Sequence, residues 1–194
     1  MAIAINDFYN MINENGVWDI NEAKKGHAHS QQLADAIIKL LPKHQLVYDL
    51  GCGTGFYAAH FAAKGFSVLA FEGTPNINEI ADYSPIIQHD LTIPLPNHVK
   101  GNAICLEVGE HIPKEHEQNF INNITEVCDG ILVLSWAIPG QGGRGHVNEQ
   151  PNDYIINEIE KRGFVYREAK SDYLRANAGK LPWFKNTLMF FERV

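Results

Sequence analysis

The chain has few cysteines and no long apolar run, and each scarcity excludes a class of protein. Its three cysteines, Cys52, Cys105 and Cys128, form no C-x-x-C pair. We therefore expect reduced thiols in a cytoplasmic protein, rather than a disulfide framework or a cysteine metal site. No apolar run reaches the length of a membrane span, and the first 16 residues do not have the pattern of a signal peptide. We expect no membrane partner.

Basic residues are also scarce. The chain has 16 Lys and Arg against 23 Asp and Glu, a formal net charge of −7, which argues against nucleic acid as a partner. The distribution is uneven, because residues 161–194 carry 8 basic and 3 acidic side chains. This locally positive end has two interpretations: a solvated face, or an attraction for an anionic small substrate.

The order of apolar and helical patterns predicts the fold class. With 194 residues, 45% of them hydrophobic and no internal repeat or linker, the chain is expected to form one domain over 1–194, with a helical cap over 1–44 and a core over 45–194. Helical patterns over 1–16, 21–41, 56–64, 114–128 and 152–162 alternate with apolar runs. The runs predict strands at 46–50, 67–71, 86–88, 103–106, 131–136, 164–168 and 187–193.

This alternation predicts an α/β, Rossmann-like fold with a mostly parallel seven-stranded sheet and helices on both faces. No helical pattern separates the last two predicted strands, so we expect an antiparallel strand at one edge of the sheet.

The most informative motif is V-Y-D-L-G-C-G-T-G, residues 47–55. A buried strand ends in an acid and is followed by a glycine turn and the start of a helix. Gly51, Gly53 and Gly55 permit a tight turn and close approach of a ligand to the backbone. The spacing is neither the G-x-G-x-x-G of dinucleotide enzymes nor a Walker motif. The alternative is an ordinary glycine turn in another doubly wound fold.

The segment resembles motif I of class I S-adenosylmethionine (SAM) dependent methyltransferases. The resemblance implies that the glycine turn and Asp49 lie at the methionine end of SAM. It assigns the ribose hydroxyls to Glu72, which follows the second strand about twenty residues past the turn. Asp90, after the third strand, would meet the adenine amino group, and the apolar Leu91 would cover the ring.

A second motif, L-E-V-G-E-H-I-P at residues 106–113, follows the fourth strand. Glu107, Glu110 and His111 lie where an acceptor would meet the methyl group. His146, in the glycine-rich loop after the fifth strand, is a candidate fourth member. Carboxylates and imidazoles at this spacing suit Mg²⁺ or Mn²⁺. The E-x-x-E-H segment is similar to that of ubiquinone-biosynthesis O-methyltransferases. With a later histidine it is also similar to small-RNA 3′-terminal 2′-O-methyltransferases, where two Glu and two His hold a metal that grips a vicinal diol.

Three roles for the acid–histidine segment stay open. In the first, Glu107, Glu110, His111 and His146 hold a divalent ion, and the last three are catalytic. In the second, His111 acts as a general base or substrate contact without metal, while Glu107 touches SAM. In the third, the segment is purely structural.

The sequence predicts a cytoplasmic SAM-dependent methyltransferase that O-methylates a small polar metabolite, a sugar or an anionic intermediate. Two alternatives are 2′-O-methylation of an RNA 3′ end and a SAM-binding module without catalysis. The short segments around the core suit a small-molecule substrate, or a site that a second subunit completes in a homodimer. His27 and His29 are candidates for a lid over SAM, and Ser30 for the N-cap of the helix that follows.

Overall fold

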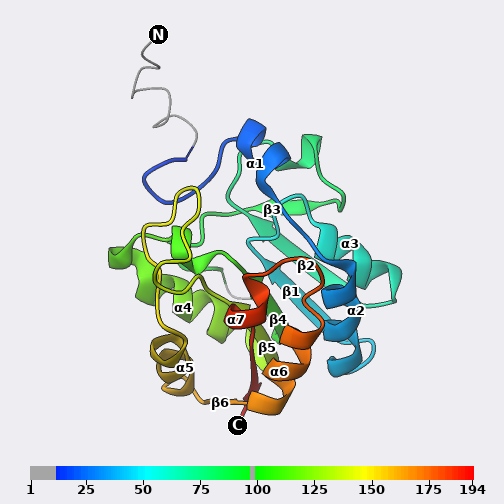
Figure 1. Ribbon diagram of the computed structural model, residues 1–194. Coiled ribbons are helices and arrows are strands. Elements are labelled where there is room, and N and C mark those ends of the chain that lie inside the picture. The colour runs from blue at the N-terminus through cyan, green and yellow to red at the C-terminus, as the bar shows by residue number, and fades with distance from the viewer. Residues whose placement is uncertain (1–11, 97–98) are drawn as a thin grey trace.

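The computed structural model describes residues 12–96 and 99–194, which form one seven-stranded sheet covered by helices on both faces (Figure 1). The strands are β1 (Leu46–Leu50), β2 (Ser67–Glu72), β3 (Ile86–Gln88), β4 (Gly101–Leu106), β5 (Cys128–Ser135), β6 (Phe164–Tyr166) and β7 (Met189–Arg193). The α-helices are α1 (Ile20–Gly26), α2 (Gln31–Leu40), α3 (Phe56–Ala63), α4 (Glu117–Glu126), α5 (Asn152–Glu160), α6 (Glu168–Ala176) and α7 (Phe184–Thr187). Three 3₁₀ turns are η2 (Ile77–Glu79), η3 (Gly109–His111) and η4 (Lys114–His116).

The strand order is β3-β2-β1-β4-β5-β7-β6. β1 to β5 are parallel, and β7 runs antiparallel to both of its neighbours, β5 and β6. The predicted Rossmann-like fold class is confirmed. β1 and β4 are adjacent although β2 and β3 come between them in sequence, so the order reverses at this point. A sheet of this kind binds ligands at the carboxyl ends of the strands beside such a reversal.

Alternation of side chains along each strand builds two cores. On one face Tyr48 and the apolar side of α4 and α5 share a buried cluster. On the other face Val47, the next residue back along β1, packs with α2, α3, α6 and α7. Successive strand residues point to opposite faces of the sheet. A strand with helices packed on both faces buries all of its side chains, which explains the continuous apolar runs in the sequence. None of the helices in the described ranges has both the length and the apolar character needed to cross a membrane.

Three expectations about helices need correction. The described part of the predicted helix over 1–16 is not helical, because Ile12 forms an isolated bridge with Trp18 around a turn; the rest of that prediction lies outside the described residues. The predicted helix over 21–41 is two helices, and Ser30 caps the second by accepting a hydrogen bond from the Leu33 N–H. The last two strands are separated by α6 and α7. α6 was missed because it buries only Ser171 and Leu174, and so has little apolar periodicity.

Candidate functional site

The glycine turn between β1 and α3 depends on backbone conformations that favour glycine. Gly51 has φ +72° and Gly53 φ +57°, in the left-handed region that side chains disfavour. A Cβ built on Gly53 would lie 2.8 Å from the ring of His27. The N–H groups of Gly51 and Cys52 both donate to the carbonyl of Phe71. The turn is therefore tied to the end of β2, and Gly55, with φ +84°, begins α3.

Glu72 is half-buried at the end of β2 and faces this turn. One carboxylate oxygen accepts from the Gly53 N–H at 3.0 Å, and the other accepts from the N–H and hydroxyl of Thr74 at 3.0 and 2.9 Å. The carboxylate is held in one orientation by groups on both sides. It lines the cavity described below and retains lone pairs for further donors.

Asp49 lies beneath the turn and is 4% exposed. Its Oδ2 has no hydrogen-bond partner within residues 12–96 and 99–194. Burial is the main cause that raises the pKa of Asp49 to about 7, with a further increase from the negative charge of Glu72. Ionisation of Asp49 is therefore unfavourable in the folded protein, and a nearby cation would favour it.

Asp90 follows β3 and is also fixed by hydrogen bonds. It accepts from the Thr92 N–H and hydroxyl at 2.8 and 2.7 Å, and from Asn15 Nδ2 at 2.6 Å. Burial raises the pKa of Asp90, but these hydrogen bonds outweigh burial and lower it below its ordinary value. Leu91 is 5% exposed and lies on the cavity wall beside Asp90.

Glu107, directly after β4, has a left-handed backbone with φ +54°, which costs a non-glycine residue about 1–2 kcal/mol. Its N–H donates to the Ser135 hydroxyl on β5. Its carboxylate accepts from Gln141 Nε2 at 2.8 Å and from the Thr187 hydroxyl at 3.2 Å. The left-handed turn directs Glu107 toward the side of the cavity formed by α7 and the loop after β5.

Glu110, His111 and His146 form a separate cluster, in which one ligand atom from each lies within 4.8 Å of the others. Glu110 is fully buried, and neither carboxylate oxygen has a hydrogen-bond partner in the described part of the chain. Burial and then the charge of Glu107 raise the pKa of Glu110 well above its ordinary value. The structure thus brings together three of the four predicted metal ligands, while the Glu107 carboxylate is directed to Gln141 and Thr187.

Both histidines of the cluster are oriented through Nδ1. His111 Nδ1 is 3.2 Å from the Gly145 carbonyl, and His146 Nδ1 is 2.9 Å from a Glu149 carboxylate oxygen. A carbonyl and a carboxylate oxygen accept, so in each ring Nδ1 is the donor and Nε2 is the nitrogen turned away from these acceptors. His146 Nε2 lies 4.0 Å from Glu110 Oε1. Burial and the neighbouring His146 lower the pKa of His111 to about 4, so His111 is neutral at pH 7.

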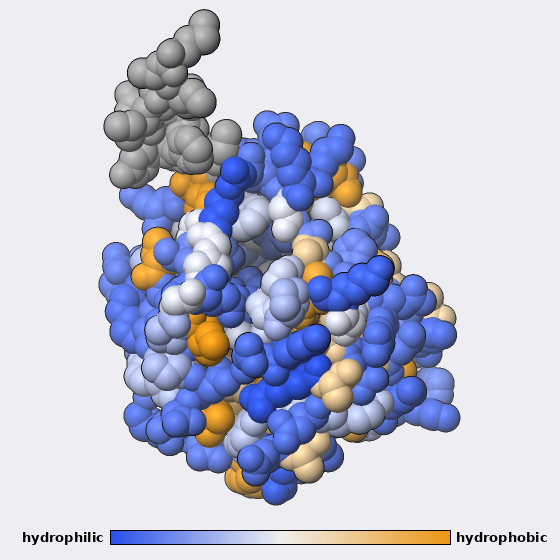
Figure 2. Space-filling model, viewed as in Figure 1, coloured by the Kyte–Doolittle hydropathy of each residue, from blue (hydrophilic) through white to orange (hydrophobic). Residues whose placement is uncertain are grey.

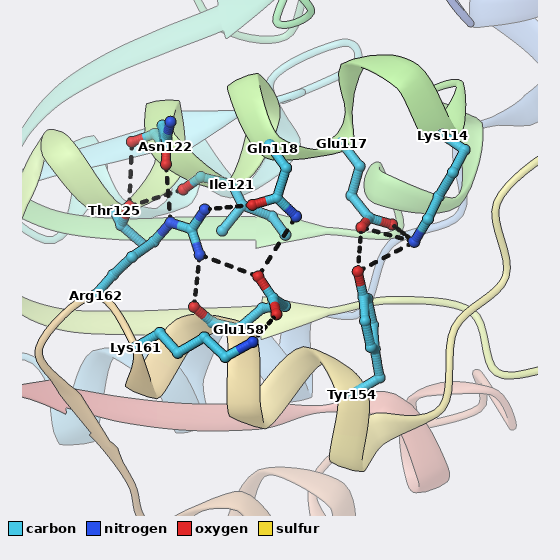
Figure 3. Close-up of polar contacts among 10 residues, drawn as sticks. All are labelled: Lys114, Glu117, Gln118, Ile121, Asn122, Thr125, Tyr154, Glu158, Lys161 and Arg162. Carbon is cyan, nitrogen blue, oxygen red and sulfur yellow. Dashed lines mark hydrogen bonds and ion pairs between the residues drawn. The ribbon is translucent and has the colours of Figure 1, made fainter.

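The loop that carries His146 is anchored on Glu110 and α4. The Glu110 carbonyl accepts from the N–H groups of Val147 and Asn148 at 2.9 and 3.0 Å. Asn148 Nδ2 donates to the buried Glu117 carboxylate, which also accepts from Lys114 and Tyr154. Figure 3 shows Lys114 and Tyr154 converging on Glu117 between α4 and α5. This anchor fixes His146 over Glu110.

Residues 12–27, which precede α2, cover the site. Trp18 of this segment stacks on His27 with ring centroids 5.5 Å apart and meets His111 edge-on at 5.4 Å. The buried Glu22 of α1 forms an ion pair with Arg144 in the loop after β5. The sequence singled out His27 but missed Trp18 and Glu22, since nothing in their local pattern distinguishes them from core residues.

One cavity of about 390 Å³ joins these groups. Its wall includes Glu72, Asp90, Glu107, Glu110 and His111, together with Trp18, His146, Trp183 and Phe184. In Figure 2 the surface is hollowed in the upper part of the molecule, with hydrophilic and intermediate residues around the opening. Five of the predicted cofactor positions line this cavity together with the acid–histidine cluster: Gly51, Glu72, Asp90, Leu91 and Glu107. Asp49, Gly53 and Gly55 are not on its wall.

The positive charge near the chain's end does not reach this cavity. Arg167 and Lys170 pair with Glu192, and Lys161 and Arg162 pair with Glu158. None of the Lys or Arg residues of 161–194 lines the cavity. These pairs support the interpretation as a solvated face.

The chain is similar in sequence to two curated proteins, both ubiquinone biosynthesis O-methyltransferases. The Rickettsia canadensis protein is 32% identical over 99 residues, which cover 46% of this chain and 41% of that protein. The Rickettsia typhi protein is 33% identical over 104 residues, covering 46% and 39%. The matched part thus spans about two fifths of these relatives. No protein-family model matches the chain.

Solved structures with the same fold include a magnesium protoporphyrin IX methyltransferase from Synechocystis with bound S-adenosylhomocysteine. Its TM-score is 0.60 at 20% identity, over 84% of this chain and 83% of that one. A TehB-like SAM-dependent methyltransferase from Corynebacterium glutamicum has a TM-score of 0.64 at 17% identity, over 90% and 93%. A cyclase also matches, with a TM-score of 0.60 at 14% identity over 87% and 84%. The fold is that of class I SAM-dependent methyltransferases, and the cyclase shows that this fold does not by itself fix the reaction.

Proposed function

We propose that this chain is a SAM-dependent O-methyltransferase for a small, uncharged, hydroxyl-bearing acceptor, assisted by a divalent cation. The single observation that carries the proposal is the shared cavity. Its wall holds both the carboxylates that the methyltransferase resemblance assigns to SAM and the cluster of Glu110, His111 and His146. The sequence similarity to O-methyltransferases supports the same reaction class.

The residues at the cofactor end fit SAM. Glu72 is held by Gly53 and Thr74 and keeps lone pairs for two ribose hydroxyls. Asp90 is ionised and lies beside the apolar Leu91, a pairing suited to the amino group and face of adenine. Burial raises the pKa of Asp49 to about 7, and the positively charged methionine part of SAM would favour its ionised form. SAM supplies an electrophilic methyl group when it is bound.

The donor set of the second cluster fits a divalent cation. Glu110 is fully buried, both of its carboxylate oxygens are unpaired among the described residues, and burial raises its pKa well above its ordinary value. A cation beside it would favour the ionised carboxylate. One ligand atom from each of the three residues lies within 4.8 Å of the others, close to the upper limit of roughly 4–5 Å for two ligands of one ion. His111, whose pKa is lowered to about 4, offers an unprotonated Nε2 atom. A bound ion of this kind lowers the pKa of a coordinated hydroxyl.

Cation assistance is favoured over general-base catalysis by His111 alone. A general base is most effective when its pKa lies near the working pH. Burial and His146 lower the pKa of His111 to about 4, so the imidazole is a weak base for an alcohol. The same neutral ring is a good metal ligand, because a ligand must offer a lone pair.

The charge of the cavity favours an uncharged acceptor over an anionic one. Four carboxylates line it, from Glu72, Asp90, Glu107 and Glu110, and among the described residues Arg144 is the only Lys or Arg on its wall. Arg144 already pairs with Glu22. Because no unpaired Lys or Arg among the described residues on this wall would hold an anionic group, we favour a sugar or another polyol, with Trp18 and Trp183 as apolar walls.

Calorimetric titration with S-adenosylhomocysteine tests the cofactor part of this proposal. The wild-type protein is expected to bind one molecule per chain. Glu72→Ala removes the proposed ribose acceptor and should weaken binding at least about tenfold, the loss of a charged hydrogen bond. Glu79→Ala, which removes an exposed acid on η2 that is not on the cavity wall, should bind as the wild type does. No binding to the wild type, or equal binding to both variants, would refute the proposal.

A further inference from the structure

We infer that Glu149 is a positioning residue for His146: its carboxylate sets the tautomer and direction of that imidazole in the acid–histidine cluster. This inference rests on the proposed function, because it concerns the readiness of the same cluster to bind a cation. It assigns a role to a residue outside the motifs of the sequence, three positions after His146.

The Glu149 carboxylate organises the glycine-rich loop as well as the histidine. Oε2 accepts from the Gly140 N–H at 2.7 Å, and Oε1 accepts from the Gly142 N–H at 2.7 Å and from His146 Nδ1 at 2.9 Å. Gly140 and Gly142 have φ of +87° and +66°. The loop thus folds around one carboxylate, and the imidazole is its third donor.

The hydrogen bonds around Glu149 make this contact one-directional. Each oxygen of the carboxylate accepts from a backbone N–H, and Oε1 also faces His146 Nδ1. A carboxylate oxygen in this setting accepts, so Nδ1 of His146 is the donor and Nε2 is the ring nitrogen on the side of Glu110. Metal-binding histidines are commonly oriented in this way by an acceptor behind the ring, and removing that acceptor typically costs 10–100-fold in metal affinity.

The other ring nitrogen of His146 lies close to the backbone of Gly143. A Cβ built on Gly143 would lie 2.2 Å from His146 Nε2, so a side chain there would displace the imidazole. Nε2 lies 4.0 Å from Glu110 Oε1, beyond hydrogen-bond distance. The two atoms therefore face each other without bonding, a separation that suits two ligands of one ion.

His111 offers an internal control, because the same loop orients it through a different acceptor. Its Nδ1 is 3.2 Å from the Gly145 carbonyl and makes no contact with Glu149. A change that only unfolds the loop would release both imidazoles. A change that removes only the Glu149 carboxylate should release His146 and leave His111 in place.

The test uses ¹⁵N NMR of the histidine side chains in the metal-free full chain, together with Mn²⁺ titration followed by electron paramagnetic resonance. Glu149→Leu keeps bulk and removes the acceptor, and Glu149→Gln keeps one acceptor oxygen. The matched control is Glu160→Gln, since the exposed Glu160 also accepts a backbone N–H, from Tyr166, but touches no histidine.

In the wild type we expect both histidines protonated at Nδ1. Glu149→Leu should mix the tautomers of His146 alone and weaken Mn²⁺ about 10–100-fold, Glu149→Gln should lie nearer the wild type, and Glu160→Gln should match it. An unchanged His146 tautomer in Glu149→Leu, or an equal change in both histidines, would overturn the inference. A third outcome is that the NMR tautomers are as expected but the wild type does not bind Mn²⁺. This outcome would refute the metal part of the proposed function and leave the role of Glu149 in orienting His146 standing.

Discussion

Replacing Asp49 with Asn should make the protein more stable at high pH, and the size of the effect follows from burial. The carboxylate is 4% exposed with one unpaired oxygen among the described residues, and burial raises its pKa from the ordinary value of 3.8 to about 7. The folded protein therefore holds this proton more tightly than the unfolded chain does. Between about pH 4 and pH 7 the folded state binds more protons, so the free energy of unfolding falls as pH rises.

The difference of about 3 pH units corresponds to about 4 kcal/mol at pH 8, since each unit is worth 1.36 kcal/mol. Asn keeps an oxygen to accept the hydrogen bond from the Ala58 N–H but cannot ionise. Asp49→Asn should match the wild type within about 1 kcal/mol at pH 4 and exceed it by as much as about 4 kcal/mol at pH 8.

Urea unfolding followed by tryptophan fluorescence at pH 4, 6 and 8 measures this difference. The exposed Asp153 provides a control, because Asp153→Asn should change stability by less than about 1 kcal/mol at each pH. The contrary result is that Asp49→Asn and the wild type differ in free energy of unfolding by the same amount at pH 4 and at pH 8. That result would show that Asp49 is ionised without penalty in the folded protein.

Three further changes test other parts of the account. Gly53→Ala should destabilise the turn by about 1–2 kcal/mol, because φ is +57° and the new methyl group would meet His27; thermal unfolding and S-adenosylhomocysteine titration should both register the loss. Glu117→Ala should cost about 1–3 kcal/mol, because the buried Asn148 amide loses its acceptor, and an unchanged urea midpoint would contradict this. Ser30→Ala should cost about 1 kcal/mol by removing the cap of α2, as measured by urea unfolding.

The parts of the fold that could be predicted from sequence are those with strong local patterns. β1 and β3 have the predicted bounds, because each is a short apolar run between turn residues. The glycine turn and the placement of Glu72 and Asp90 at strand ends followed from the logic of parallel sheets. α6 could not be predicted in this way, because its contacts with the sheet come mainly from Leu174.

The residue types of the candidate site could be predicted from the sequence, but their detailed contacts could not. The sequence placed Glu107 with Glu110 and His111, and all three line one cavity. The contacts of the Glu107 carboxylate with Gln141 and Thr187 depend on a left-handed backbone at Glu107 that the sequence did not predict. Such a conformation depends on the contacts of the β5 end and α7, which no local pattern records. Contacts between distant segments, such as Trp18 on His111, are likewise set by the fold and not by spacing along the chain.

The most direct test of a metal-assisted methyltransferase is the number of Mn²⁺ ions bound by the protein saturated with S-adenosylhomocysteine. Electron paramagnetic resonance of wild type, His111→Ala and His116→Ala would measure it, with His116 as a control because it lies on η4 and is not on the cavity wall. We expect one ion per chain in the wild type and in His116→Ala, and none in His111→Ala. No bound ion in the wild type, or an ion that persists in His111→Ala, would contradict the assignment of Glu110, His111 and His146 as the cation site.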